Sequence, residues 1–261
     1  MSKISEKAAA LLQEGTVKMI IGYEQGTERP RPIFCHTPED CKKLIFNDQC
    51  KNNLAVYLTK KEIVNDDKIG VIGNFYVVKT VIQLFLENQI NLDQFVIMTV
   101  EENGDLISFT NIEGMKQYVS SHEPPTNPAV LAAIEKIDQM SREERWEYWK
   151  SELSKCIRCY ACRAACPLCY CNRCITDVNC PQWLEPWAAP LSNIEWQINR
   201  IMHMSGRCVG CGECAAACPL ELPIGILTKK MGMDIKDTFG GWKEGNALST
   251  YKVDDKENFI H

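Results

Sequence analysis

The feature that most constrains this chain is a cysteine run that occurs twice. In each copy four cysteines are separated by two, two and three residues, and a proline follows the fourth: CIRCYACRAACP in residues 156–167 and CVGCGECAAACP in residues 208–219. Thiolates are strong ligands for soft and borderline metals, so cysteines at such regular spacing predict metal binding. We therefore expect residues 155–227 to form a domain organised around bound metal.

This spacing is the one with which bacterial-type ferredoxins hold cubane iron–sulfur clusters, and there the fourth cysteine of each run ligates the other cluster. We predict two [4Fe–4S] clusters with crossed ligands. The ligands of the first are Cys156, Cys159, Cys162 and Cys218. The ligands of the second are Cys208, Cys211, Cys214 and Cys166. Paired zinc knuckles are the alternative, but four cysteines and a proline in each run favour iron–sulfur.

Other cysteines lie outside the two runs. A compact set between them has the spacing C-x-C-x2-C-x5-C and consists of Cys169, Cys171, Cys174 and Cys180. A third tetrathiolate site, holding zinc or a third [4Fe–4S] cluster, is the sharper hypothesis, and free thiols or extra cluster ligands are the alternative. The N-terminal part contains Cys35, Cys41 and Cys50, which fit no standard metal pattern and are predicted to be buried thiols.

Residues 1–123 alternate between strand-like and helix-like segments, which predicts an α/β layer. Helices are expected over residues 3–14, 37–46 and 75–89, and strands over residues 17–21, 33–34, 54–58, 68–73 and 95–100. Gly70 and Gly73 fit either a phosphate-binding turn at a helix start or plain packing. The missing glycines of the dinucleotide fingerprint favour packing.

Residues 124–154 are expected to form a linker and lead-in helices, because the prolines of EPPTNP interrupt the chain before them. One helix should begin at Asn127, and the capping box Ser141-x-x-Glu144 should open the next. Trp146 and Trp149 lie on the face of that second helix which leads to Cys156, so they are expected to shield the first cluster.

Two more segments follow the same logic. A capping box that begins at Ser192 predicts a helix to about Gly206, with an apolar side formed by Ile194, Ile198, Ile201 and Met202. Residues 228–261 are polar and interrupted by glycines, and we expect an extended arm that docks on a partner rather than a disordered tail. The predicted fold class is α+β: an N-terminal α/β layer followed by a mostly helical ferredoxin-like domain.

Composition excludes some classes of partner. The net charge of -5 over 261 residues argues against nucleic acid and anionic membranes, because both favour clustered Lys and Arg. The first residues do not resemble a signal peptide, and no window is apolar enough for a membrane span. We therefore expect a cytoplasmic protein, of an anaerobe, whose cysteines stay reduced on metal. Arg158, Arg163 and Arg173 would favour reduced clusters or dock an acidic partner.

The stretch KCIRCYACRAACPLCYCNRC resembles the beta subunits of deazaflavin-linked hydrogenases and formate dehydrogenases, in which an α/β flavin domain accompanies ferredoxin-like clusters. EGTVKMIIG, TPEDCKKL and KIGVIGNFYVV occupy comparable places, so the resemblance extends over about residues 10–220. Related two-cluster subunits accompany heterodisulfide-reductase-like complexes. Where that family has a Pro-Cys pair this chain has Asn74-Phe75, so the resemblance implies the relay role and the eight cluster cysteines but not the catalytic site.

The leading functional prediction is an electron-transfer subunit that works with other redox subunits of a hetero-oligomeric complex, because no acid, base or nucleophile constellation accompanies the cysteine runs. One alternative is an oxidoreductase subunit with a flavin in residues 1–123, which splits hydride into single electrons for the clusters. A zinc-stapled interaction module is the third.

Overall fold

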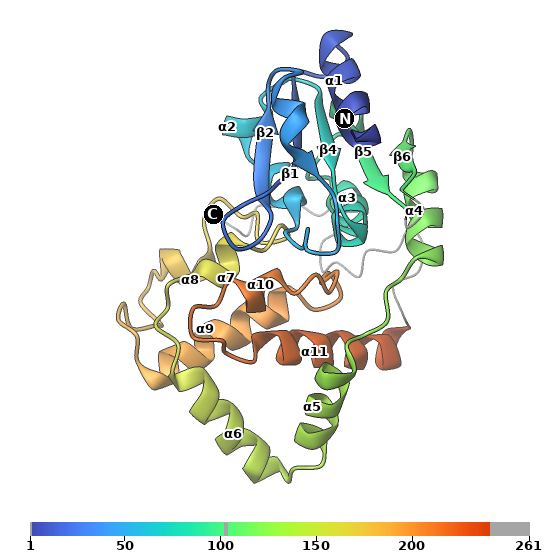
Figure 1. Cartoon of the computed structure of the whole chain (residues 1–261). Coiled ribbons are helices and arrows are strands. Elements are labelled where there is room, and N and C mark those ends of the chain that lie inside the picture. Colours follow the sequence, from blue (N-terminus) through green and yellow to red (C-terminus); the bar gives the residue numbers. More distant parts are fainter. Residues whose placement is uncertain (1, 102–103, 241–261) are drawn as a thin grey trace. The chain divides into compact units, whose positions relative to one another are not determined.

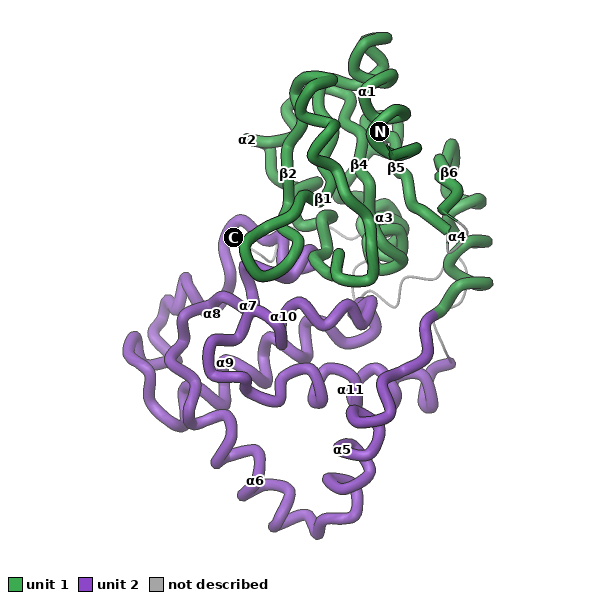
Figure 2. Tube along the Cα trace, viewed as in Figure 1, with its two compact units in different colours: residues 1–123, 244–261 green, residues 124–243 purple. Residues whose placement is uncertain are grey.

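The computed structural model describes residues 2–101 and 104–240 (Figure 1). The chain divides into two compact units, the first ending at Glu123 and the second beginning at Pro124 (Figure 2). The first is mixed α/β with a six-stranded sheet, whereas the second contains helices and no strand among the described residues. None of the helices in these ranges is both long enough and apolar enough to span a membrane.

The sheet of unit 1 has parallel strands at its centre and antiparallel strands at its edges. Its strands are β1 Met19–Glu24, β2 Arg31–Cys35, β3 Leu44–Ile45, β4 Ile69–Ile72, β5 Phe95–Val100 and β6 Leu106–Phe109. The order is β2-β1-β4-β5-β6, with β3 also paired to β1. β1 pairs parallel with β4, and β4 with β5. The central strand β4 is buried at every residue, as expected of a parallel strand covered on both faces.

Helices cover this sheet. Unit 1 contains α1 Lys3–Gln13, α2 Lys61–Val64, α3 Phe75–Leu86 and α4 Ile112–Ser121, and three short 3₁₀ helices at Asp40–Lys43, Leu54–Tyr57 and Leu92–Gln94. The apolar face of α1, with Ile4, Ala8 and Leu11, packs in one core with Ile20 of β1 and Ile72 of β4. α3 is buried over most of its length and packs against α4 and β5. β6 and α4 were not predicted from the sequence.

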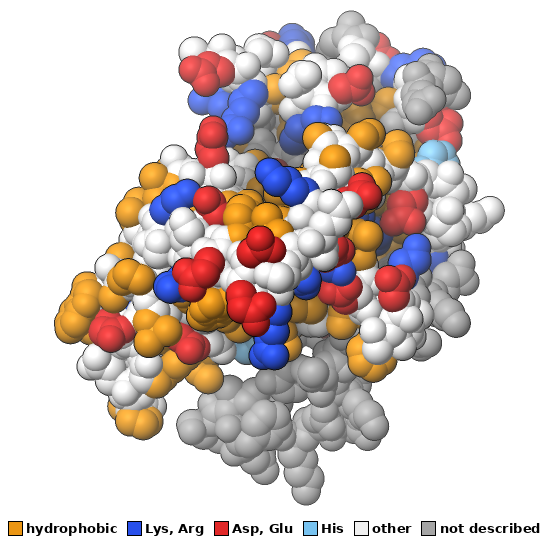
Figure 3. All heavy atoms as spheres, turned by 90° about the horizontal axis from the view of Figure 1, so that it is seen from below, with side chains coloured by type: hydrophobic (Ala, Val, Ile, Leu, Met, Phe, Trp, Pro, Cys, Tyr) orange, Lys and Arg blue, Asp and Glu red, His pale blue; other side chains and the backbone are white. Residues whose placement is uncertain are grey.

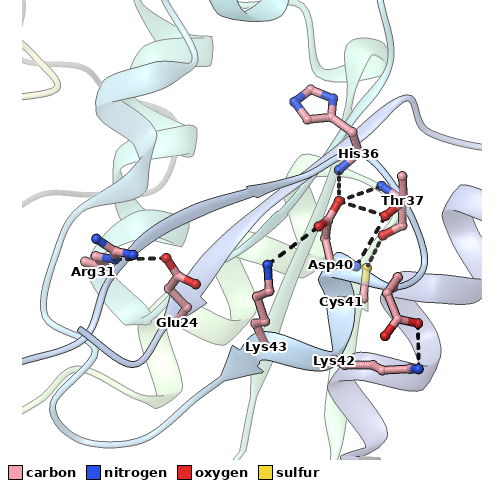
Figure 4. Close-up of polar contacts among 9 residues, drawn as sticks. Glu24, Arg31, His36, Thr37, Asp40, Cys41, Lys42 and Lys43 are labelled. Atoms are coloured by element: carbon pink, nitrogen blue, oxygen red, sulfur yellow. Dashed lines mark hydrogen bonds and ion pairs between the residues drawn. The ribbon is translucent and has the colours of Figure 1, made fainter. Parts of the chain in front are cut away.

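The helix predicted over residues 37–46 is wrong. Only the start of it forms: the carboxylate of Asp40 accepts hydrogen bonds from the Thr37 hydroxyl at 2.8 Å and from the backbone N–H groups of Thr37 and His36, and the Thr37 hydroxyl accepts from the N–H of Asp40 (Figure 4). These bonds close a turn and hold the pKa of Asp40 below its usual range. The chain then continues as a single 3₁₀ turn and as β3, whose Leu44 pairs with Glu24 of β1.

The strand predicted over residues 54–58 is also wrong, because Asn53 caps a 3₁₀ helix there. Its side-chain oxygen accepts from the N–H of Ala55, while its amide donates to the buried Thr80 hydroxyl at 2.8 Å. Two glycines that suggested a phosphate site have a packing reason, since a Cβ at Gly70 would collide with Ile20 and one at Gly73 with Val77. Packing was the preferred interpretation.

The helices of unit 2 surround the cysteine runs. They are α5 Pro128–Asp138, α6 Arg142–Ser154, α7 Ala161–Ala164, α8 Ile175–Val178, α9 Pro190–His203, α10 Glu213–Ala216 and α11 Ile224–Phe239. Asn127 caps α5 as predicted, with Pro128 in the first turn. Ser141 and Glu144 form both hydrogen bonds of the predicted capping box at the start of α6. α6 packs along α9, and α11 contacts α5, α9 and α10.

Three expectations for unit 2 are corrected. α9 begins at Pro190, whose fixed φ suits the first helical turn, so Ser192 is no cap and accepts a hydrogen bond from the N–H of Glu185 instead. The predicted apolar side of α9 is split, because Ile198 and Met202 are exposed. The extended arm is wrong for residues 228–239, which belong to α11 because Ile224 and Thr228 are buried. Residues 241–261 lie outside the described residues.

Candidate metal centre

The two cysteine runs share one backbone conformation. In the first run Arg158 and Tyr160 have φ of 52° and 58°, and at the same places of the second run Gly210 and Gly212 have φ of 80° and 78°. A four-residue helix begins one residue after the second left-handed residue in each run, α7 at Ala161 and α10 at Glu213. The sequence repeat is therefore a structural repeat.

Each run uses this conformation to direct a backbone N–H group at its first cysteine. The N–H of Arg158 donates to the sulfur of Cys156 at 3.4 Å, and the N–H of Gly210 donates to Cys208. Closely spaced left-handed residues turn successive N–H groups to one side and create a concavity that suits an anion, as at many iron–sulfur sites. A cluster with four thiolate ligands is such an anion, so these residues fit the group that the spacing implies.

The first run holds its strained turn with side chains. Left-handed φ costs free energy at residues with a Cβ. The Arg158 guanidinium donates to the carbonyls of Glu185 and Trp187 and, at 3.1 Å, to the Tyr160 hydroxyl. The Tyr160 ring packs edge-on against Trp196 with 4.9 Å between the ring centroids. The second run needs no such support, because both of its left-handed residues are glycines.

The core of unit 2 contains cysteines of both runs. Cys156 and Cys162 are buried together with Trp196, Leu222 and Ile224. The partly buried residues packed against this group are Tyr160, Cys174, Cys214 and Cys218. The fourth cysteine of the second run thus lies in the core that holds cysteines of the first.

The fourth cysteine of the first run lies near cysteines of the second. Cys166 and Cys214 lie close enough to Cys208 for their charges to raise its pKa. The Cys166 sulfur is 3.8 Å from the sulfur of Met204 and forms a hydrogen bond with Cys169. That bond lowers the pKa of Cys166 and raises the pKa of Cys169, because it favours the thiolate of one and the thiol of the other.

The third cysteine set is spread over different surroundings. Cys169 contacts Cys166, and Cys174 packs against the core with Cys156, while Cys171 and Cys180 are exposed. Within residues 2–101 and 104–240 no three side chains of His, Cys, Asp or Glu stand close enough to hold one metal ion. In a cubane the cysteines bond different irons, so their sulfurs stand farther apart than around a single ion.

A buried polar face of α9 contacts the cysteines, and it was not predicted from the sequence. Asn193, Gln197 and Arg200 follow one another at helical spacing and are 1%, 1% and 4% exposed. Asn193 donates to the carbonyl of Cys156 at 2.5 Å, and Gln197 donates to the Cys156 sulfur at 3.5 Å. The available signal was the spacing of these three polar residues on one face of a helix, beside Trp196.

Arg200 is a buried cation beside the cysteine sulfurs. Burial by itself lowers the pKa of Arg200, but negative charge on the sulfurs of Cys214, Cys162 and Cys169 raises it, and Cys214 also accepts a hydrogen bond from it. Burial raises the pKa of Cys162 to about 11, and the positive charge of Arg200 opposes that shift. The three arginines singled out in the sequence did not include this one.

Those three arginines and the tryptophans of α6 have other places. Arg158 is buried and donates hydrogen bonds to carbonyl groups, Arg163 forms an ion pair with Asp177, and Arg173 is exposed. Trp146 is 50% exposed, so it does not shield the cysteines as expected. Trp196, at 1% exposed, packs beside Cys156 and Cys162 instead. Helical periodicity predicted the face of α6 but not which helix covers the cysteines.

The cysteines of unit 1 are buried thiols, as predicted. Cys35 and Cys41 are fully buried in the core beneath α1 and share a hydrogen bond, and Cys50 is 3% exposed. Burial raises the pKa of Cys35 to about 12 and also raises that of Cys41 and Cys50. These thiols therefore stay protonated at neutral pH.

The molecule thus combines a mixed α/β unit with a helical unit built around a duplicated cysteine turn. No protein-family model matches the chain. A stretch of 75 residues, 29% of the chain, is 34% identical to the beta subunit of an F420-dependent formate dehydrogenase from Methanocaldococcus jannaschii. The match spans 19% of that protein's length, so the similarity to this oxidoreductase subunit is partial.

Proposed function

We propose that the chain is an electron-transfer subunit of an oxidoreductase complex and relays single electrons through two [4Fe–4S] clusters. When bound, such clusters accept and release one electron each without bond chemistry. The observation that carries the proposal is the shared turn of the two runs, with left-handed residues at the same places and a backbone N–H directed at the first cysteine. Residues 155–227 are the proposed cluster-binding part.

Crossed ligation assigns Cys156, Cys159, Cys162 and Cys218 to the first cluster and Cys208, Cys211, Cys214 and Cys166 to the second. The interaction that supports the crossing is the electrostatic effect of Cys166 on Cys208. Cys218 packs against the core with Cys156 and Cys162, as the crossing requires, and Cys214 packs there too. The N–H donors of both runs would stabilise the negative charge on the ligand sulfurs, and Trp196 would keep water from the first site.

Iron and acid-labile sulfide analysis of anoxically purified protein tests the cluster assignment. We expect about eight irons per chain and, after reduction, the paramagnetic signals of reduced cubanes. Clearly fewer irons, or zinc in their place, would overturn it. To test the crossing, Cys218→Ser should perturb the same paramagnetic signal as Cys156→Ser, and Cys166→Ser the same signal as Cys208→Ser.

A third site at Cys169, Cys171, Cys174 and Cys180 remains a proposal of the same kind, with zinc or a third [4Fe–4S] cluster as occupant. Cys174 is partly buried and packs against the core that contains Cys156 and Cys162, which supports a role for this segment near the clusters. Anomalous scattering at the iron and zinc edges would count the sites and identify each metal. The absence of any anomalous peak near this set would leave its cysteines as thiols.

The proposed partners are other redox subunits of a hetero-oligomeric complex. The relative from Methanocaldococcus is named as one subunit of a formate dehydrogenase. Large hydrophobic side chains are exposed around the cysteine runs, among them Ile157, Ile175, Trp183, Trp187 and Leu191. On the face shown in Figure 3, hydrophobic side chains reach the surface among interspersed acidic and basic ones, without a field of one sign. The large hydrophobic side chains exposed near the cysteine runs are what supports a docking surface there.

A flavin-containing oxidoreductase subunit is the second candidate, favoured by the F420 dependence in the relative's name. The start of α3, where a phosphate would bind, is already capped: Asn74 accepts from the N–H groups of Tyr76 and Val77, and it donates to the carbonyl of Cys50 at 2.8 Å. Extraction of the anoxically purified protein decides the matter. A fluorescent flavin in about equal amount to the chain would support this function, and a colourless extract would exclude it.

A further inference from the structure

Arg200 of α9 is a buried cation surrounded by thiols of both cysteine runs. Its residue surface is 4% exposed. Its guanidinium donates to Cys214, the third cysteine of the second run, and it lies within electrostatic range of Cys162, the third cysteine of the first. Cys169, which contacts Cys166, is the third thiol near it. The side chain therefore lies between the two proposed cluster sites.

This guanidinium has unused donors. Its Nε and one terminal nitrogen, Nη2, are buried without a hydrogen-bond partner among the described residues. No ion pair with a carboxylate is formed by Arg200 in that part of the chain, whereas Arg163 pairs with Asp177. A buried cation is normally paired, because removal from water strongly disfavours an isolated charge. Unused N–H donors beside thiols point to a negatively charged group there.

We propose that Arg200 sets the reduction potentials of both clusters, an inference that rests on the electron-relay function proposed above. Reduction transfers one electron from a low-potential donor to a cluster, forms and breaks no bond, and makes the cluster more negative by one charge. A fixed positive charge stabilises that reduced state, and in a buried site the attraction is weakly screened. Because Arg200 lies between the sites, both clusters become easier to reduce.

Such a position also has a consequence for electron relay. An exposed arginine would raise the potential of one cluster only slightly, since water and salt screen its charge. A single buried cation near both sites raises the two potentials together and changes the difference between them little. Loss of its charge should therefore affect both steps of the relay rather than one.

The test is a potentiometric titration of the full-length, anoxically purified protein, followed by electron paramagnetic resonance. Arg200→Gln removes the charge and Arg200→Lys keeps it with fewer donors. Arg163→Gln is the matched control, because Arg163 follows Cys162 directly but is partly exposed and paired with Asp177. Iron content is measured first, so that loss of the clusters, which would bear on the proposed function, is distinguished from a shift in potential.

We expect Arg200→Gln to disfavour reduction of both clusters at least tenfold, which is about 59 mV for a one-electron couple. Arg200→Lys should shift both potentials in the same direction by less, and Arg163→Gln should leave them near the wild-type values. Full iron with unchanged potentials in both Arg200 variants would overturn the proposal. Loss of iron in both variants would overturn it as well, because Arg200 would then be a structural residue.

Discussion

The two units place the same residue type in opposite surroundings. In unit 1, Cys35 and Cys41 are enclosed by apolar side chains, and burial raises the pKa of both thiols. In unit 2, backbone N–H groups donate to Cys156 and Cys208, and a buried arginine donates to Cys214. Burial also raises the pKa of Cys162 and Cys208 to about 11, but in unit 2 the positive charge of Arg200 opposes that shift. The left-handed turns and the buried cation Arg200 therefore distinguish the cysteines of unit 2, in addition to their spacing.

The largest difference between the two units is expected in the iron content of cysteine variants. Cys162→Ser, in the core of unit 2, is expected to lose about half of the iron, because one proposed cluster loses a ligand. Cys41→Ser, in the core of unit 1, should keep all of it. Iron analysis of both variants, purified anoxically in parallel, is the measurement. Equal iron in the two variants would contradict the division between the units.

The raised pKa of Cys35 in unit 1 should make the free energy of unfolding depend on pH in the alkaline range. Up to about pH 9, its ordinary pKa, Cys35 is protonated in the folded and the unfolded chain; as pH rises from there to about 12, the unfolded chain loses this proton first. The stability that this raised pKa contributes is therefore complete below about pH 9 and lost as pH rises through that window.

The measurement is denaturant unfolding at increasing pH, monitored by circular dichroism. Cys35→Ala should flatten the alkaline decline in the free energy of unfolding, although it lowers stability at neutral pH through the smaller side chain. A variant with the same alkaline slope as the wild type would show that Cys35 ionises equally in both states.

A smaller effect should separate a special glycine from an ordinary one. Gly212→Ala is expected to destabilise unit 2 by about 1–2 kcal/mol, because alanine is strained at a φ of 78°. Gly232→Ala, in the exposed middle of α11 with open space around it, should stabilise by up to about 1 kcal/mol through helix propensity. Thermal unfolding of the two anoxically purified variants compares them. Shifts of the same sign would contradict the role of the left-handed turn.

Local signals in the sequence predicted several elements correctly. The capping box at Ser141 and the cap at Asn127 act within one helical turn, and the apolar run of residues 95–100 became β5. The predictions failed where distant parts of the chain decide. Leu44 pairs with β1, and Asn53 caps a 3₁₀ helix while binding Thr80 on α3. Neither partner is near in sequence, so neither could be inferred from a local pattern.

The candidate site divides in the same way. The repeated spacing predicts a repeated cysteine turn, and both runs adopt it, with left-handed residues at the same places. The position of Arg200 depends on the packing of α9 against the cysteine loops, so no motif in the sequence marks it. Trp146 and Trp149 do show a helical pattern in the sequence, and we predicted that they shield the cysteines. Trp196 of another helix covers the cysteines instead.

The two runs differ in how independent they are of their surroundings. Residues 208–219 adopt the turn with glycines, whereas residues 156–167 require Arg158 to reach carbonyls of a segment nearly thirty positions later, at Glu185 and Trp187. The turn of the second run is thus encoded within the run itself, so a designer can move that turn into another scaffold, together with a cysteine in the place of Cys166 for the proposed cluster. The first would have to be moved together with residues 185–187, because its geometry is encoded in two places.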